Sequence, residues 1–139
     1  MTVKLEHALA TALAVTLSLL GGWSPVLAGL LVLQCLDIAS GIAAAGSAGR
    51  ISSKVGWRGL TKKVCTWIAI ALIAQVETLL GADFQVFGLE VSLRDGGAMW
   101  YCAIEAISIT ENLGEAGVPL PQVLMDAVAV LKGKGERSE

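Results

Sequence analysis

GSAGRISSKVGWRGLTKK, residues 46–63, is a basic stretch between two apolar ones, and this contrast indicates the class of fold. It holds five of the ten Lys and Arg residues and no acid: Arg50, Lys54, Arg58, Lys62 and Lys63. Asp37 is the only formal charge from residue 8 to residue 45, and Glu77 is the only one from 64 to 81. Lys and Arg remain on the cytoplasmic side of membrane proteins, because anionic lipid attracts them and they resist translocation. The pattern predicts an integral membrane protein in which residues 46–63 form a basic cytoplasmic loop, anchored at the membrane surface.

The composition supports this interpretation. The chain has 139 residues, of which 55% are hydrophobic and 16% charged, and its mean hydropathy is +0.70. Soluble proteins are about one quarter charged, and a chain this short has little interior in which to bury the excess apolar residues. We therefore expect a single membrane domain over residues 1–139, with the lipid bilayer as its surroundings. Nucleic-acid binding is not indicated, since the basic stretch has one aromatic residue and no recognised binding motif.

Four apolar blocks have lengths suited to membrane helices, which rise about 1.5 Å per residue across a core of about 30 Å. They are residues 8–21, 26–45, 64–81 and 97–113. The sequence thus predicts an all-α fold of helical hairpins, with about four transmembrane helices and a short C-terminal amphipathic helix. The charge distribution predicts an outer loop at residues 82–96, a cytoplasmic tail at 114–139, and both termini in the cytoplasm.

Three segments are open to more than one interpretation. Residues 8–21 resemble a signal-peptide core, but Glu6 beside Lys4 and the apolar sequence after Pro25 favour a first helix in a tight hairpin. Residues from Lys54 toward Lys63 suit a short helix lying on the membrane surface. Apolar residues recur at about every second position from Phe84 to Leu93, which indicates a short hairpin or an interfacial segment.

Acids within apolar spans are costly, and they mark either a function or a contact inside the protein. On a helix, Tyr101, Glu105, Ser108 and Asn112 fall on one stripe. The candidates for a polar interface or pore lining are Asp37, Glu77, Tyr101, Glu105, Ser108, Glu111 and Asn112. The alternative is that Glu77 and Glu111 reach water at the span ends, while Asp37 and Glu105 are protonated or bonded within the bundle.

Small residues in the second apolar block have the spacing that lets membrane helices approach closely. The candidate packing residues are Ala39, Gly41, Ala43 and Ala45, and the alternative is that they are alanine-rich filler.

Enzymatic activity is not indicated. The chain has no HExxH, GxSxG or P-loop motif, and its three cysteines lie in separate blocks, without CxxC spacing or a nearby histidine. We expect no catalytic residue, no metal and no cofactor.

Two parts of the sequence resemble the phage holins of the toxin-secretion/phage-lysis family, which includes phi29-type and clostridial toxin-locus holins. The first comprises Asp-Ile-Ala-Ser-Gly at residues 37–41 and Ser-Ser-Lys-x-Gly-Trp-x-Gly-x-x-Lys-Lys at 52–63. The second comprises Glu-Ala-Ile-Ser-Ile-x-Glu-Asn at 105–112 and Gly-Val-Pro-x-Pro at 117–121. The resemblance covers residues 30–131, although the alanine-rich second block and the long acidic loop depart from the family pattern.

This resemblance implies a holin that oligomerises in the host cytoplasmic membrane. The lesions it forms would release an endolysin or a large toxin and trigger cell lysis, and an antiholin is a further implied partner. Two alternatives remain open. One is a small multidrug or proton-coupled transporter, although such exporters rely on a carboxylate in the first helix, and the first block has none. The other is an antiholin or accessory membrane subunit.

Overall fold

A computed structural model of the chain describes residues 2–50, 53–81, 85–86, 89–90 and 92–135. The fold is helical, as predicted. Its elements are α1 (Thr2–Leu19), α2 (Pro25–Ser47), α3 (Ser53–Leu80), β1 (Gln85–Val86), β2 (Leu89–Glu90), α4 (Leu93–Glu115) and α5 (Gln122–Gly135).

Of the two interpretations of the segment between α3 and α4, a short hairpin or an interfacial segment, the structure shows a short hairpin. β1 and β2 pair in antiparallel fashion, with Gln85 opposite Glu90 and Val86 opposite Leu89. The remaining apolar positions of the period-two pattern, apart from Leu93, lie outside the described residues.

Local signals in the sequence fix where the helices begin. Ser24 accepts a hydrogen bond from the backbone N–H of Leu27 (3.3 Å), and Pro25 occupies the first turn of α2. Ser92 caps α4 in the same way, through the N–H of Asp95 (3.0 Å). The turn between α1 and α2 passes through Gly21 and Gly22, whose φ angles of +66° and +94° favour glycine.

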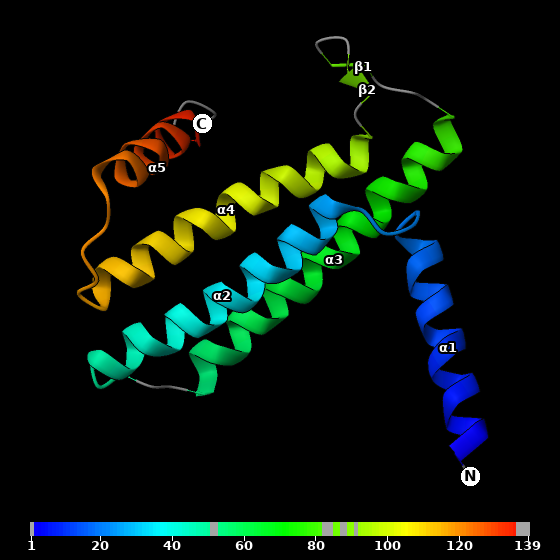
Figure 1. The fold of residues 1–139 in the computed structure, drawn as a ribbon, viewed down its shortest axis with the longest axis horizontal. Helices are drawn as coiled ribbons and strands as arrows, with labels where there is room; N and C mark the ends of the chain where they lie inside the picture. The colour runs from blue at the N-terminus through cyan, green and yellow to red at the C-terminus, as the bar shows by residue number, and fades with distance from the viewer. Residues whose placement is uncertain (1, 51–52, 82–84, 87–88, 91, 136–139) are drawn as a thin grey trace.

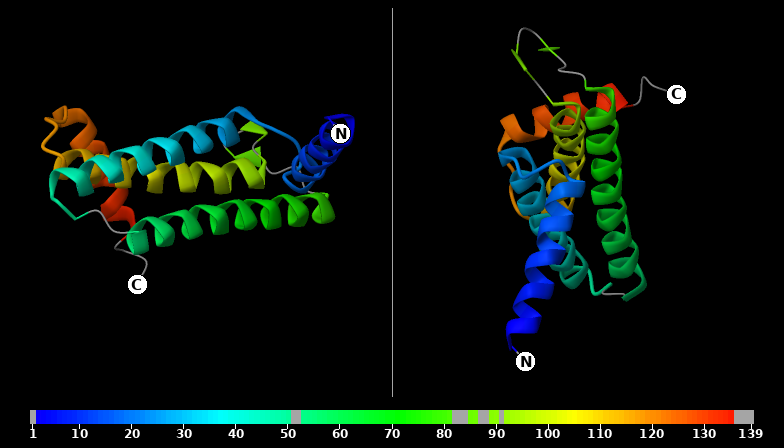
Figure 2. Two further views of the ribbon diagram at one scale, coloured as in Figure 1. Left: turned by 90° about the horizontal axis from the view of Figure 1, so that it is seen from below. Right: turned by 90° about the vertical axis from the view of Figure 1, so that its right-hand side faces the viewer.

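Helices α2, α3 and α4 lie side by side, whereas α1 diverges from them and α5 folds back beside α4 (Figures 1 and 2). We call the end of the bundle where α1 and α3 finish and α2 and α4 start the hairpin end. The opposite end, where α2 and α4 finish and α3 starts, is the basic end. Helix α4 packs mainly against α2, which runs parallel to it, and also against α3.

The apolar core lies toward the hairpin end and joins α2, α3 and α4. Its buried residues are Leu20, Leu27, Leu30, Ile70 and Ala98. Gly97 faces α3, and because a Cβ at this position would lie 2.8 Å from Cδ1 of Ile73, any larger residue would require the Ile73 side chain to shift.

The outer surface of α2 and α3 is apolar as well. Many large side chains are exposed there, among them Leu31, Val32, Leu36, Ile42, Ile68, Leu72 and Leu79. An apolar surface this extensive marks a membrane or protein contact.

Two helices of the described chain are long and apolar enough to cross a membrane, Pro25–Ser47 and Gly59–Leu80, and not the four that we predicted. The two remaining predicted spans fall in α1 and α4. The first turns of α1 carry Lys4 and Glu6, and α4 carries Glu105, Glu111 and Asn112. These polar residues lower the hydropathy of both helices.

The predicted loop at residues 46–63 is also mostly helical, because α2 ends at Ser47 and α3 begins at Ser53. We expected a separate surface helix before a span beginning at Val64, and this was wrong. Gly56 and Gly59 each weaken a helix by about 1 kcal/mol relative to alanine, but neither ends it. The helix therefore continues into the apolar block without a break.

Candidate functional site

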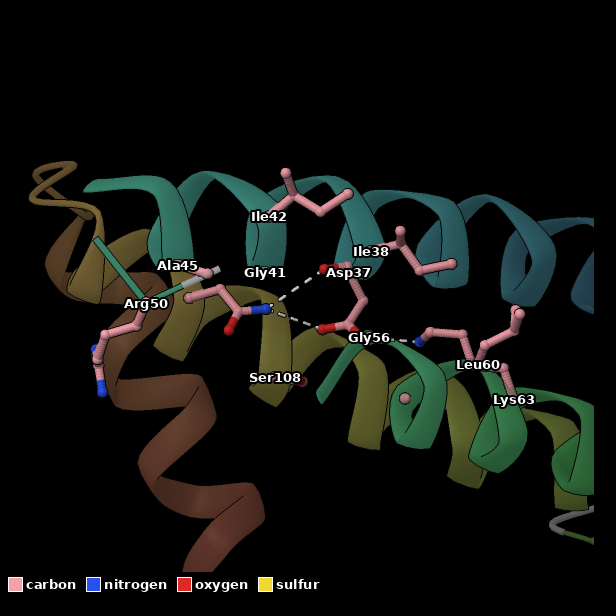
Figure 3. Close-up of a pocket in the computed structure, with 12 residues that line it drawn as sticks. Asp37, Ile38, Gly41, Ile42, Ala45, Arg50, Gly56, Leu60, Lys63 and Ser108 are labelled. Atoms are coloured by element: carbon pink, nitrogen blue, oxygen red, sulfur yellow. Dashed lines mark hydrogen bonds and ion pairs between the residues drawn. The ribbon is translucent and has the colours of Figure 1, made fainter. Parts of the chain in front are cut away.

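A buried ionic cluster joins the three packed helices in the half of the bundle toward the basic end. We call it the Lys63 cluster, and it comprises Asp37 and Ser40 of α2, Lys63 of α3, and Glu105 and Asn112 of α4. The Nζ atom of Lys63 lies 2.8 Å from Oδ2 of Asp37 and 2.6 Å from Oε2 of Glu105. Figure 3 shows the Lys63 side chain reaching toward Asp37.

Asn112 completes the cluster from α4. Its Nδ2 donates to Oδ1 of Asp37 (3.1 Å), to Oγ of Ser40 (3.1 Å) and, at 3.4 Å, to the main-chain oxygen of Asp37. Ser40 in turn donates to that same main-chain oxygen (3.1 Å). Each of the three helices is thus bonded to another through a polar side chain.

Water screens this cluster only weakly. The side chains of Lys63, Asp37 and Glu105 are 10%, 17% and 11% exposed. Removing one partner of a buried ion pair costs about 3–5 kcal/mol, because it leaves an uncompensated charge. With one cation and two carboxylates, the ionised cluster has a formal charge of +1 − 2 = −1.

The stripe predicted on the fourth apolar block faces the other helices. Glu105 and Asn112 belong to the Lys63 cluster, Ser108 lines a cavity beside it, and Tyr101 packs against the apolar core. Glu111 is an exposed residue of the same helix.

Glu77 lies at the hairpin end, away from the Lys63 cluster. Its two carboxylate oxygens accept hydrogen bonds from the backbone N–H groups of Leu93 (2.9 Å) and Arg94 (3.1 Å). A carboxylate is favoured at a helix N-terminus, where the backbone N–H groups lack partners. Glu77 therefore caps α4 and fixes it to the end of α3.

Arg94 was not singled out from the sequence, yet it organises the hairpin end. Its Nη1 donates to the main-chain oxygens of Leu20 and Gly21 (2.8 Å each) and of Gly22 (3.3 Å). Its Nε donates to Asp95 (2.9 Å), which also accepts from the hydroxyl of Ser24 (2.9 Å). Arg94 thus holds the turn between α1 and α2 against the start of α4.

The five basic residues predicted to anchor the chain at the membrane surface lie in different surroundings. Arg50 is exposed and pairs with Glu115 at 3.5 Å, and Lys62 is exposed. Lys63 is buried, in contrast to our expectation, because its side chain joins two carboxylates in the interior. The side chains of Lys54 and Arg58 lie outside the described part of the structure.

One signal in the sequence points to the burial of Lys63. Once α3 is a continuous helix, Lys63 shares a face with Trp67, Ile70 and Ala74 by helical spacing. Ile70 and Ala74 are buried, and Trp67 is half-buried. Trp67 donates to Oε1 of buried Gln34 (2.8 Å), which adds a second polar link between α2 and α3.

The four small residues of α2 divide between two faces. Gly41 and Ala45 are half-buried and line the cavity beside the Lys63 cluster, whereas Ala39 and Ala43 are exposed. A Cβ at Gly41 would lie 3.5 Å from Nδ2 of Asn112, which is an ordinary van der Waals distance, so Gly41 faces α4 but the approach of α4 does not require glycine there. Close packing by Ala39 and Ala43 stays a prediction.

An apolar exterior around buried ion pairs suits a helical membrane protein, and comparison with known sequences identifies which kind. Residues 14–133 match the bacteriophage holin family. This chain belongs to that family. The matched region of this holin-family protein extends from within α1 into α5, and so contains the whole Lys63 cluster. Membership supports a membrane location and a holin-like role.

Among the relatives, one is named a probable holin and the others described here are uncharacterised. A probable holin of Bacillus phage phi105 is 27% identical, over 78% of this chain and 75% of its own length. An uncharacterised protein of Halalkalibacterium halodurans is 36% identical, over 89% of this chain and 91% of its own. An uncharacterised 14.9 kDa protein of Clostridium perfringens is 31% identical, over 82% of each chain. No solved structure matches the chain significantly.

Proposed function

We propose that copies of this holin-family protein assemble in the bacterial cytoplasmic membrane into lesions. The lesions release an endolysin to the cell wall, or in a toxin locus a large toxin, and so trigger lysis. The observation that carries the proposal is the contrast between an apolar exterior on α2 and α3 and the buried Lys63 cluster. A dispersed copy can reside in lipid because the polar groups of the Lys63 cluster are paired inside the bundle. In an assembly, the same groups can contact water.

The inward stripe of α4 has a role in each state. In the dispersed bundle, Glu105 bonds to Lys63 and Asn112 bonds to Asp37. These groups do not turn toward lipid, because an unpaired charge in hydrocarbon costs several kcal/mol. When copies assemble, α4 separates from its neighbours and the same groups face a water-filled lumen, where hydration replaces the lost ion pairs.

The orientation follows from the exposed cations. Arg50 and Lys62 lie at the basic end, and we infer that this end faces the cytoplasm because exposed cations favour that side of the membrane. Helix α4 runs beside α2 in the same direction, so it brings the chain back to this side and places α5 at the cytoplasmic surface.

Inducible expression in a bacterium, with and without a cytoplasmic endolysin, tests the function. We expect abrupt growth arrest, followed by a fall in optical density and release of a cytoplasmic enzyme only when the endolysin is present. Depolarisation without endolysin-dependent lysis would contradict protein release and indicate an ion pathway. Normal growth at verified membrane expression would refute lesion formation and leave the antiholin or transporter alternatives.

The Glu105→Gln variant tests the role of α4 in the same assay. Because the substitution removes one charge from the Lys63 cluster, the time from induction to lysis should change. Unchanged timing at equal expression would contradict this role.

A further inference from the structure

A cavity of about 410 Å³ opens beside the Lys63 cluster, between α2 and α3 and against α4 (Figure 3). Large apolar side chains on its walls are Ile38, Ile42 and Leu60. These three side chains are also exposed on the outside of the bundle, so the cavity opens to the surroundings of the helices. Glycines leave its α3 side open, since a Cβ at Gly56 or Gly59 would meet nothing within 4 Å.

The cavity lies at one end of both helices that are able to cross a membrane. Its lining includes Ala45, in the last turn of α2, and Gly59, where the apolar part of α3 begins. Trp57 lies two residues before this apolar part and is 71% exposed, and tryptophan is enriched at the boundary between membrane and water. With both helices in a bilayer, the cavity therefore extends from the headgroup layer into the hydrocarbon of one leaflet. The molecule that surrounds its opening is a phospholipid.

Arg50 places a positive charge at the headgroup level of this cavity, because it lies in the connection between α2 and α3. The charged residues of the lining are Asp37, Arg50 and Lys63, one acid and two cations, which leaves a charge of +1. Lys63 is 10% exposed and already held by Asp37 and Glu105, so Arg50 is the lining cation that an occupant can contact. Glu115 lies outside the lining.

The ion pair between Arg50 and Glu115 does not prevent such a contact. Its two groups are 3.5 Å apart, and their side chains are 71% and 61% exposed. Ion pairs between side chains this exposed are weak. A guanidinium binds phosphate through two parallel N–H groups, so a phosphate at Arg50 competes well with this carboxylate.

We propose that the cavity binds one anionic phospholipid. Arg50 contacts the phosphate of the headgroup, and one acyl chain lies in the cavity against Ile38, Ile42 and Leu60. The site requires only the folded bundle in a membrane, so this proposal does not depend on lesion formation.

Native mass spectrometry of the full chain tests the proposal. The protein is released from detergent micelles that contain equal amounts of phosphatidylglycerol and phosphatidylcholine with the same acyl chains. We expect one retained lipid per copy, with phosphatidylglycerol favoured about fivefold, the factor that one cation near an anionic headgroup provides. Equal retention of the two lipids would overturn the anionic occupant. Displacement of the lipid by inorganic phosphate at the same concentration would show that the acyl chain is not held, and would overturn the proposal as well.

Three substitutions test the role of Arg50 in the same experiment. Arg50→Gln should remove the preference for phosphatidylglycerol, whereas Glu115→Gln should increase it, because the phosphate no longer competes with a carboxylate. Lys62→Gln is the matched control, since Lys62 is an exposed cation near the same end that does not line the cavity. An unchanged preference in Arg50→Gln would refute the contact. An equal loss in Arg50→Gln and Lys62→Gln would indicate general attraction between charges, and would refute the site.

Two matched substitutions locate the acyl chain. Gly59→Leu fills the cavity without changing a charged group, and Gly29→Leu adds the same side chain to α2 outside the lining, where a Cβ also meets nothing within 4 Å. Leucine favours a helix more than glycine does, so neither change should unfold the protein. We expect Gly59→Leu to abolish lipid retention and Gly29→Leu to preserve it. Gly56→Leu is a second filling variant, and retained lipid in both filled variants would refute this location.

Discussion

Lys63→Met should separate the helices, because it removes the one cation that two buried carboxylates share. Methionine retains most of the length of the side chain, so lost packing contributes little. A hydrogen bond to a charged group contributes about 1.5–3 kcal/mol, and two such bonds are lost. The resulting 3–6 kcal/mol agrees with the usual cost of about 3–5 kcal/mol for breaking a buried ion pair.

We expect this loss in reversible SDS-induced unfolding in mixed micelles, followed by tryptophan fluorescence. The matched control is Lys62→Met, at the exposed neighbouring position, which should change stability by no more than about 0.5 kcal/mol. Replacing all three charged groups, as Lys63→Met, Asp37→Asn and Glu105→Gln together, should recover most of the loss, because no buried charge is left unpaired. If Lys63→Met is as stable as Lys62→Met, the cluster does not hold the bundle together and the reasoning is wrong.

Further predictions concern packing and the two other polar links, with stability measured by the same unfolding assay. Gly97→Val should cost about 1–3 kcal/mol through overpacking between α3 and α4, whereas Gly96→Val, where a Cβ meets nothing within 4 Å, should not show this loss. Trp67→Phe should lower the free energy of unfolding by about 1–3 kcal/mol, because Gln34 loses its hydrogen-bond donor. Adding Gln34→Leu should restore part of this stability, and no recovery would contradict a stabilising Trp67–Gln34 hydrogen bond. Arg94→Met should broaden the distribution of distances between spin labels on α1 and α4, because the turn after α1 loses its hydrogen bonds to Arg94. An unchanged distribution would show that Arg94 does not hold this turn in place.

Helical secondary structure and the inward stripe of α4 could be predicted, since both follow from local periodicity and hydropathy. The apolar blocks marked the helices, and Gly21-Gly22 and Ser24-Pro25 marked the first turn. The helical spacing of four residues places them on one face of α4, although it does not show what that face contacts. They are Tyr101, Glu105, Ser108 and Asn112.

The partners of polar residues could not be predicted in the same way, because they depend on which helices become neighbours. Lys63 follows other cationic residues in the sequence, and its charge alone predicts a side chain exposed at the surface. Its burial follows only once α3 is continuous and brings it opposite Asp37 and Glu105. Glu77 likewise caps a helix that begins sixteen residues later in the chain, after a hairpin whose path local patterns do not fix.

The number of membrane-crossing helices was difficult to predict for the same reason, since it depends on which helices become neighbours. Hydropathy favours a helix with few polar residues, such as α2 and the part of α3 from Gly59 to Leu80. Helix α4 hides Glu105 and Asn112 against its neighbours, so the polar residues that lower its hydropathy are also the ones that fix its place in the bundle.

We propose that the inner face of α4 is closed in the dispersed protein and opens to water in the lesion. Ala98 shares this face and is 0% exposed, whereas Ile104 is 45% exposed on another face of the same helix. The most direct measurement is the labelling rate of Ala98→Cys by a membrane-impermeant thiol reagent, before and after the onset of lysis, with Ile104→Cys as the control. The native cysteines are first replaced by serine at Cys35, Cys65 and Cys102.

Ala98→Cys should be protected before lysis and react rapidly afterwards, while the labelling rate of Ile104→Cys should change little. If Ala98→Cys stays protected while the cytoplasmic enzyme is released, the bundle does not open, and another surface lines the lesion.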